Sequence, residues 1–212
     1  MSYLQLKDYY ERCLADHGPT HLGVDWPNPE GMETRYKVMA SLIDWADAPV
    51  HVLDVGCGPG FFLDYQHKPA SPPKLRYRGD DISPAMIAAA QARHPQAAFE
   101  ARDLMEDPLE EASVDYAVFN GVFTVRQDMS EQDAFDFTAR LLSAVFLACR
   151  RGLAVNFMAP HADYRDDSLF YLAFDEAAQL FKAKLSRHFR FRSDYGLWEY
   201  TAYVYRAPTG SL

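Results

Sequence analysis

The sequence predicts an α/β fold in which a mostly parallel sheet is covered by helices on both faces. Three observations lead to this fold class. Short apolar runs alternate with helix-like segments from about residue 50 to residue 159, a pattern typical of parallel strands joined by crossover helices. A glycine-rich turn, Gly56 to Gly60, follows the first apolar run. Two strand-like segments near the C-terminus are joined by a short connection, which favours antiparallel pairing.

The expected strands are short segments rich in apolar and β-branched residues. They cover residues 50–54, 75–79, 97–101, 114–119, 152–159, 189–193 and 199–206. The expected helices that alternate with them cover residues 60–65, 85–93, 131–149 and 175–186.

Capping residues support several of these boundaries. Ser83 and Pro84 suit the N-cap and the first position of a helix. The segment from Ser130 to Asp133 has the pattern of a capping box. Arg150, Arg151 and Gly152 are expected to end the helix that starts near residue 131, because cations and glycine are favoured at helix C-termini.

Residues 1–49 precede the first strand and are expected to form a helical, partly irregular lid over the site. A helix is expected at residues 33–45, and glycines and prolines between residues 18 and 31 make the preceding part irregular. Residues 50–212 are expected to form the main domain, so the chain is one structural domain overall.

The composition is that of an ordinary globular protein, with 49% hydrophobic and 24% charged residues among 212. The net charge of −9 disfavours a nonspecific nucleic-acid binder, which needs a basic surface.

Three scattered cysteines without a CxxC motif indicate neither a disulfide framework nor a zinc site, so a cytoplasmic location is expected. No apolar run approaches the length of a membrane span. His17 and His21 have metal-like spacing, but the intervening Gly-Pro prevents a helix there, so no metal is expected.

The glycine turn is the main functional motif. Asp54 ends the first strand, and Gly56, Gly58 and Gly60 follow it, which lets the backbone approach a ligand closely. Dinucleotide sites prefer GxGxxG, whereas Phe61 occupies the position of the third glycine. This spacing favours a smaller nucleoside ligand such as S-adenosylmethionine over a nicotinamide or flavin dinucleotide.

An acidic pair follows the second expected strand. Asp81 lies 21 residues after Gly60, where a carboxylate can accept hydrogen bonds from ribose hydroxyls. Its neighbour Asp80 is expected to be a solvated or loop-bonding residue instead.

Together these motifs resemble the class I S-adenosylmethionine-dependent methyltransferases of the small-molecule type. The resemblance covers roughly residues 33–206 and is carried by the glycine turn after Asp54 and by the segment Gly79 to Met86. It implies a Rossmann-like, seven-stranded sheet whose last strand is antiparallel, with S-adenosylmethionine as the cofactor.

The resemblance also implies individual contacts to the cofactor. Asp54 and the backbone of Gly56, Cys57 and Gly58 would lie along its methionine part. Asp81 would bind the ribose hydroxyls and Ile82 would pack on the adenine. Asp103 would accept from the adenine amino group, and Leu104 would present its backbone N–H. Asn120 would lie beside the sulfonium, and Arg35 would meet the methionine carboxylate.

The methyl acceptor is expected in the crevice at the C-terminal strand ends. The loop after the expected strand at 152–159 contains His161 and Tyr164, which are candidates for a catalytic role, with His161 able to take a proton. No catalytic residue is assigned, and Cys57 is not expected to act as a nucleophile.

The expected function is methyl transfer from S-adenosylmethionine to a small-molecule acceptor. Two alternatives remain open at this point: a noncatalytic accessory subunit that binds S-adenosylmethionine, and a nicotinamide-dependent oxidoreductase. The sequence does not identify the acceptor, the atom that is methylated, or the oligomeric state.

Overall fold

The computed structural model describes residues 3–44, 49–66 and 75–209. Its strands are β1 (Val50–Val55), β2 (Leu75–Asp81), β3 (Ala98–Ala101), β4 (Val114–Phe119), β5 (Cys149–Met158), β6 (His188–Arg192) and β7 (Glu199–Tyr205). Its helices are α1 (Leu4–His17), the 3-10 helix η1 (Leu22–Val24), α2 (Pro29–Ala40), α3 (Phe61–Gln66), α4 (Pro84–Arg93), α5 (Glu131–Ala148) and α6 (Phe174–Lys184). Among these described helices, none has the length and apolarity to cross a membrane.

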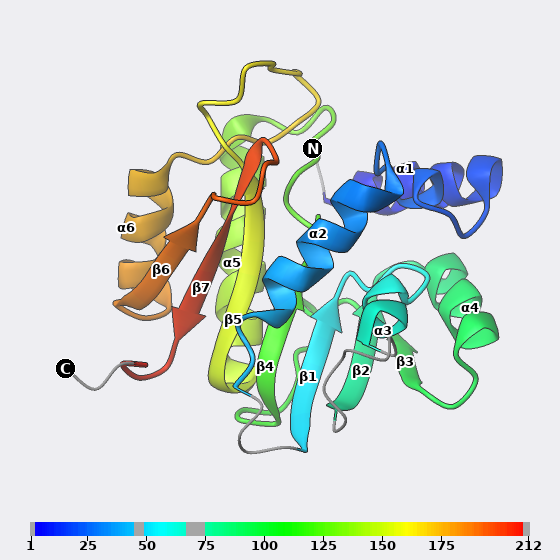
Figure 1. The fold of residues 1–212 in the computed structure, drawn as a ribbon, viewed down its shortest axis with the longest axis horizontal. Coiled ribbons are helices and arrows are strands. Elements are labelled where there is room, and N and C mark those ends of the chain that lie inside the picture. Colours follow the sequence, from blue (N-terminus) through cyan, green and yellow to red (C-terminus); the bar gives the residue numbers. More distant parts are fainter. Residues whose placement is uncertain (1–2, 45–48, 67–74, 210–212) are drawn as a thin grey trace.

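The strands form one seven-stranded sheet in the order β3-β2-β1-β4-β5-β7-β6 (Figure 1). The strands β3, β2, β1, β4 and β5 run parallel to one another. The last strand, β7, lies between β5 and β6 and is antiparallel to both. The predicted fold class, including the antiparallel last strand, is therefore confirmed.

Both faces of the sheet are buried, because successive residues of a strand point to opposite sides. In β1, Leu53 and Val55 pack with residues of α5 and α6, whereas Val50 and Val52 pack with residues of α2 and α3. Figure 1 shows α2 in front of the sheet and α5 behind it. The continuous apolar run of β1 is the consequence of this two-sided cover.

The helix expected at residues 33–45 starts earlier and ends earlier than predicted. Asn28 caps α2, because its side chain accepts a hydrogen bond from the Gly31 N–H at 2.7 Å, and Pro29 occupies the first turn. The helix ends at Ala40, where the Ser41 hydroxyl donates to the Val38 carbonyl at 2.7 Å. An Asn-Pro pair is an N-terminal signal that the analysis of the sequence did not use.

The helix predicted to run to about Cys149 ends at Ala148, so its end is confirmed, but Arg150, Arg151 and Gly152 are not the residues that end it. These residues belong to β5, which starts directly after α5 at Cys149. A Cβ on Gly152 would lie 2.4 Å from the Val204 carbonyl oxygen, so the glycine permits close approach of β7 and does not end a helix. Arg206 caps α5 instead, since its guanidinium donates to the carbonyls of Phe146, Leu147 and Cys149.

Helix α1 was not predicted, although Leu6, Tyr10 and Leu14 follow a helical spacing. It packs on η1 and α4. This position brings α1 over the C-terminal ends of the parallel strands, where Leu6, Lys7 and Tyr10 line a cavity.

Candidate functional site

A cavity of about 160 Å³ lies at the carboxyl ends of the parallel strands. Four strand ends, β1 to β4, contribute to its walls, and α1 covers it with Tyr3, Leu6, Lys7 and Tyr10. Eight of the ten residues predicted to bind the cofactor line this cavity: Gly56, Cys57, Gly58, Asp81, Ile82, Asp103, Leu104 and Asn120. The crevice at the strand ends is where open α/β sheets bind ligands.

The glycine turn forms one wall of the cavity. Gly56 and Gly58 have φ angles of 65° and 52°, a region that glycine adopts without strain. The N–H of Gly56 donates to the Asp80 carbonyl at 2.8 Å, which ties the turn to the end of β2. A Cβ on Gly56 would lie 2.8 Å from Val122 Cγ2. The turn therefore leaves its backbone close to the cavity and allows no side chain at this position.

The Asp81 carboxylate is the main acidic group in the cavity. It accepts hydrogen bonds from the N–H of Gly58 at 2.9 Å and of Ser83 at 2.8 Å. Burial raises the pKa of this carboxyl to about 6, although these two hydrogen bonds oppose the shift. A carboxylate has about four acceptor positions, so about two remain for hydroxyl donors of a ligand.

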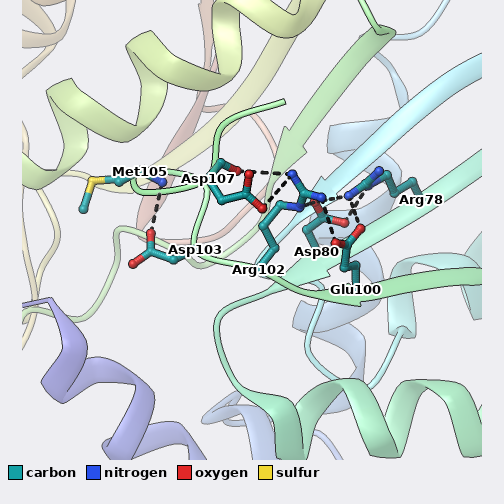
Figure 2. A network of polar contacts seen from close by, with 7 residues as sticks. All are labelled: Arg78, Asp80, Glu100, Arg102, Asp103, Met105 and Asp107. Carbon is teal, nitrogen blue, oxygen red and sulfur yellow. Dashed lines mark hydrogen bonds and ion pairs between the residues drawn. The ribbon is translucent and has the colours of Figure 1, made fainter. Parts of the chain in front are cut away.

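The neighbouring Asp80 has a structural role in a network of charges between β2 and β3 (Figure 2). Its carboxylate accepts from Arg78 at 2.7 and 3.0 Å and lies 3.8 Å from Arg102. Both arginines also contact Glu100, at 2.6 and 2.7 Å. Asp80 is only 1% exposed, so the expectation of a solvated residue is wrong. Its carboxylate is hydrogen-bonded to Arg78 of β2, and only its main-chain carbonyl accepts from the glycine turn.

Asp103 connects the cavity to α1. Its carboxylate accepts from the Met105 N–H at 3.0 Å (Figure 2) and from the Tyr3 hydroxyl at 2.6 Å. Burial and the hydrogen bond to Asp103 raise the pKa of Tyr3 to about 12, so the hydroxyl remains a donor at neutral pH. A second contact joins the Ser83 hydroxyl to the Glu11 carboxylate at 2.7 Å. Helix α1 is thus hydrogen-bonded to the site through its N-cap residue Tyr3 and through Glu11 near its middle.

Asn120 follows β4 and carries an unsatisfied side chain. Both its amide nitrogen and its amide oxygen are buried, and neither has a hydrogen-bond partner among the described residues. The next residue, Gly121, donates its N–H to Asn156 Oδ1 at 2.8 Å. A buried amide without partners is costly, and this one lies in the wall of the cavity.

Asp54 lies behind the cavity wall rather than in it. Its buried carboxylate accepts from the Tyr77 hydroxyl at 2.8 Å, and burial raises its pKa to about 7. Burial also raises the pKa of the Cys57 thiol well above its ordinary value. A protonated thiol is a poor nucleophile, which agrees with the expectation for Cys57.

Arg35 and the two catalytic candidates lie elsewhere. Arg35 and Tyr164 line a second cavity beside the first. His161 is exposed and stacks near Phe174, with ring centroids 6.4 Å apart. The Arg35 guanidinium lies 4.0 Å from the centre of the Trp26 ring, and Trp26 in turn covers Gly121. Trp26 thus lies between Arg35 and Gly121, and it lines both cavities.

Comparison with known proteins agrees with this geometry. Residues 52–144 match the family described as a methyltransferase domain. A relative in Mycobacterium tuberculosis (strain ATCC 25618 / H37Rv), named “Putative methyltransferase Rv1506c”, is 33% identical over 172 residues, which are 78% of this chain and 98% of the relative. The chain belongs to the class I S-adenosylmethionine-dependent methyltransferases.

Solved structures of similar fold support the same architecture. The magnesium protoporphyrin IX methyltransferase of Synechocystis PCC 6803, solved with bound S-adenosylmethionine, has a TM-score of 0.64 at 18% identity, with 97% of both chains covered. The 1,6-didemethyltoxoflavin-N1-methyltransferase of Burkholderia thailandensis has a TM-score of 0.63 at 19% identity, covering 94% of this chain and 86% of that one. At these identities the likeness concerns the fold.

The residues of the methyltransferase cavity fit S-adenosylmethionine, the cofactor of this family. The buried Asp81 carboxylate has acceptor positions to spare, the amide of Asn120 lacks partners, and the glycine turn exposes backbone to the cavity. This donor and acceptor set suits a nucleoside with ribose hydroxyls better than a pyrophosphate, because the lining holds three carboxylates, Asp80, Asp81 and Asp103, against the two cations Lys7 and Arg102.

Proposed function

We propose that this methyltransferase transfers the methyl group of S-adenosylmethionine to a small-molecule acceptor. The observation that supports it best is the cavity at the ends of β1 to β4, where Asp81 and Asn120 offer unused hydrogen-bonding capacity. When bound, the cofactor supplies an electrophilic methyl group on a sulfonium, which leaves as a thioether.

In this proposal each lining residue has one task. Asp81 accepts the two ribose hydroxyls, and Ile82 packs on the adenine. Asp103 and the backbone N–H of Leu104 bind the adenine edge. The backbone of Gly56, Cys57 and Gly58 follows the methionine part, and Asn120 lies near the reacting methyl. Asp54 lies behind the glycine turn and supports it from there.

Residues 1–49 act as a lid over the domain formed by residues 50–212 in this proposal. The support comes from the two contacts that join α1 to the site, Tyr3 with Asp103 and Glu11 with Ser83. Catalysis rests on positioning the acceptor and excluding water. His161 stays a prediction as a proton acceptor and Tyr164 as a catalytic candidate, and the contact between Arg35 and the methionine carboxylate stays a prediction too.

The small-molecule class is supported by charge and by the named activities of similar proteins. The chain has a net charge of −9, which is unfavourable for a nucleic-acid substrate. By their names, the two solved enzymes act on a magnesium porphyrin and on a toxoflavin precursor. A cytoplasmic location belongs to the same proposal, and it is supported by three unpaired cysteines.

The test is calorimetric titration with S-adenosylhomocysteine and, in parallel, with NADH. We expect micromolar binding of S-adenosylhomocysteine and none of NADH. Radioactive methyl transfer to a panel of small acceptors then separates an enzyme from a noncatalytic accessory subunit, because the latter binds the cofactor but yields no labelled product. Absence of S-adenosylhomocysteine binding would contradict the proposal.

A further inference from the structure

A second cavity of about 400 Å³ adjoins the cofactor cavity. Tyr10, Val24 and Trp26 line both cavities, so the two cavities lie side by side along these three residues. Tyr164 and Trp198 also line the second cavity, yet their side chains are 60% and 55% exposed. They therefore lie at its mouth, where large apolar surface remains in contact with solvent.

The walls of this second cavity are aromatic. Trp26, Tyr164, Tyr171 and Trp198 contribute rings from three separate segments of the chain. The Arg165 guanidinium lies 4.5 Å from the centre of the Tyr171 ring, which extends the flat surface at this side. Aromatic surfaces favour flat ring systems that stack or pack edge-on. The exposed rings at the mouth gain contact only when a ligand covers them.

One buried cation supplies the polar character of this cavity. Arg35 is 8% exposed, and its Nε donates to Glu199 Oε2 at 2.8 Å. Its Nη1 atom is buried and has no hydrogen-bond partner among the described residues. A buried N–H group without a partner is destabilising. Arg35 lines the second cavity, so a turn of its guanidinium toward the cavity would let a ligand oxygen accept from this donor.

The charges around Arg35 determine whether a neutral or an anionic oxygen group of a ligand is favoured there. The Glu199 carboxylate already balances the guanidinium, and it is held by Asn156 Nδ2 at 3.2 Å and by the Tyr195 hydroxyl at 3.4 Å. Asp25 adds a second carboxylate to the lining. The cavity thus has no excess positive charge, so a carbonyl-type oxygen is favoured over a carboxylate or a phosphate.

We propose that the second cavity binds the methyl acceptor, and that the acceptor is a neutral, flat aromatic molecule with a carbonyl-type oxygen directed at Arg35. This inference rests on the proposed function, because it places the acceptor beside the cofactor cavity. A hydroxyl or N–H group of the acceptor attacks the methyl carbon. The new bond joins that oxygen or nitrogen to the methyl group, the carbon–sulfur bond breaks to leave the neutral thioether, and the proton passes to solvent through the mouth of the cavity.

The inference also gives Arg35 a different role from the one predicted from the sequence. Arg35 binds the carbonyl-type oxygen of the acceptor, and Trp26 lies between Arg35 and the cofactor cavity. A lysine at this position keeps the charge beside Glu199 but loses the planar fork of donors. Arg35→Lys should therefore change acceptor selection while binding of S-adenosylhomocysteine stays the same.

The test measures binding and does not require turnover. Three probes of similar size are titrated calorimetrically, in the presence and absence of S-adenosylhomocysteine: para-hydroxyacetophenone, para-ethylphenol without the carbonyl, and para-hydroxybenzoate with a negative charge. We expect the ketone to bind about tenfold more tightly than either of the others, as one hydrogen bond to a charged donor allows. Trp198→Ala should weaken ketone binding about tenfold through loss of ring contact, and the exposed Leu147 on α5 offers Leu147→Ala as the control variant.

The outcomes separate the inference from the proposed function. Equal binding of the three probes, or ketone binding that survives Trp198→Ala, overturns the inference even when S-adenosylhomocysteine binds normally. If Arg35→Lys weakens S-adenosylhomocysteine binding and leaves the ketone preference intact, Arg35 serves the cofactor and the inference is wrong. Ketone selectivity without any binding of S-adenosylhomocysteine supports the aromatic site but contradicts the proposed function.

Discussion

The role of Asp81 allows the most direct test of the cofactor site. Asp81→Asn preserves the shape of the side chain but removes its charge and one of its two acceptor atoms. The carboxylate already serves the N–H groups of Gly58 and Ser83, so its remaining positions are the ones available to two ribose hydroxyls. Hydrogen bonds to a charged group contribute about 1.5–3 kcal/mol each. We expect the variant to lose about 2 kcal/mol or more of binding free energy, which is about thirtyfold in Kd.

The assay is calorimetric titration of S-adenosylhomocysteine, with adenosine and its dideoxy analogue as a second pair of ligands. Wild-type protein should discriminate between the two nucleosides, and Asp81→Asn should lose most of this discrimination. Asp128 is exposed and does not line the cavity, so Asp128→Asn is the matched control. A change below about threefold in Asp81→Asn, or an undiminished preference for adenosine, would refute the assignment of Asp81 to the ribose.

The raised pKa of Asp81 adds a dependence on pH. Its carboxyl has a pKa of about 6 because it is buried, and the ionised form is the better acceptor for two hydroxyls. Affinity for S-adenosylhomocysteine should therefore decrease as the pH falls below about 6, by up to tenfold per pH unit. The same titration with Asp81→Asn should be nearly flat over this range.

Three further predictions concern stability and the lid. Asp54 has a folded pKa of about 7, above its ordinary value of 3.8, so its contribution to stability is complete below pH 3.8 and is lost as the pH rises through 7. In urea denaturation, Asp54→Asn should remove a decrease of up to about 1.4 kcal/mol per pH unit across this window, and equal slopes for both proteins would contradict the burial argument. Tyr3→Phe removes the hydrogen bond to Asp103 but keeps the ring, so α1 should open more easily. The association rate of S-adenosylhomocysteine, measured by stopped flow, should then increase about tenfold. An unchanged rate would argue against a lid. Gly152→Ala places a Cβ 2.4 Å from the Val204 carbonyl oxygen and should cost about 1–3 kcal/mol of unfolding free energy, whereas a neutral effect in thermal unfolding would mean that β5 and β7 can move apart.

Local signals in the sequence located most of the fold. The apolar run from Val50, the glycine turn after Asp54 and the Ser83-Pro84 pair each predicted an element that the structure contains. The predictions were wrong where a residue that resembles a local signal is required by a contact with a distant part of the chain. Gly152 resembles a helix stop, but it is needed because β7 passes close to it, and β7 lies about 50 residues further along the chain.

By itself, the sequence determined the fold class and the residues that surround the cofactor cavity, because strand periodicity and the spacing of glycines and carboxylates are local properties. Only the tertiary structure decided which of those residues face the same space. It places Asp54 behind the wall, sets Arg35 beside Glu199 across 164 residues of chain, and lays α1 over the strand ends. Such contacts depend on how separate elements pack, and packing is decided by the shapes of surfaces that no single segment of the sequence contains.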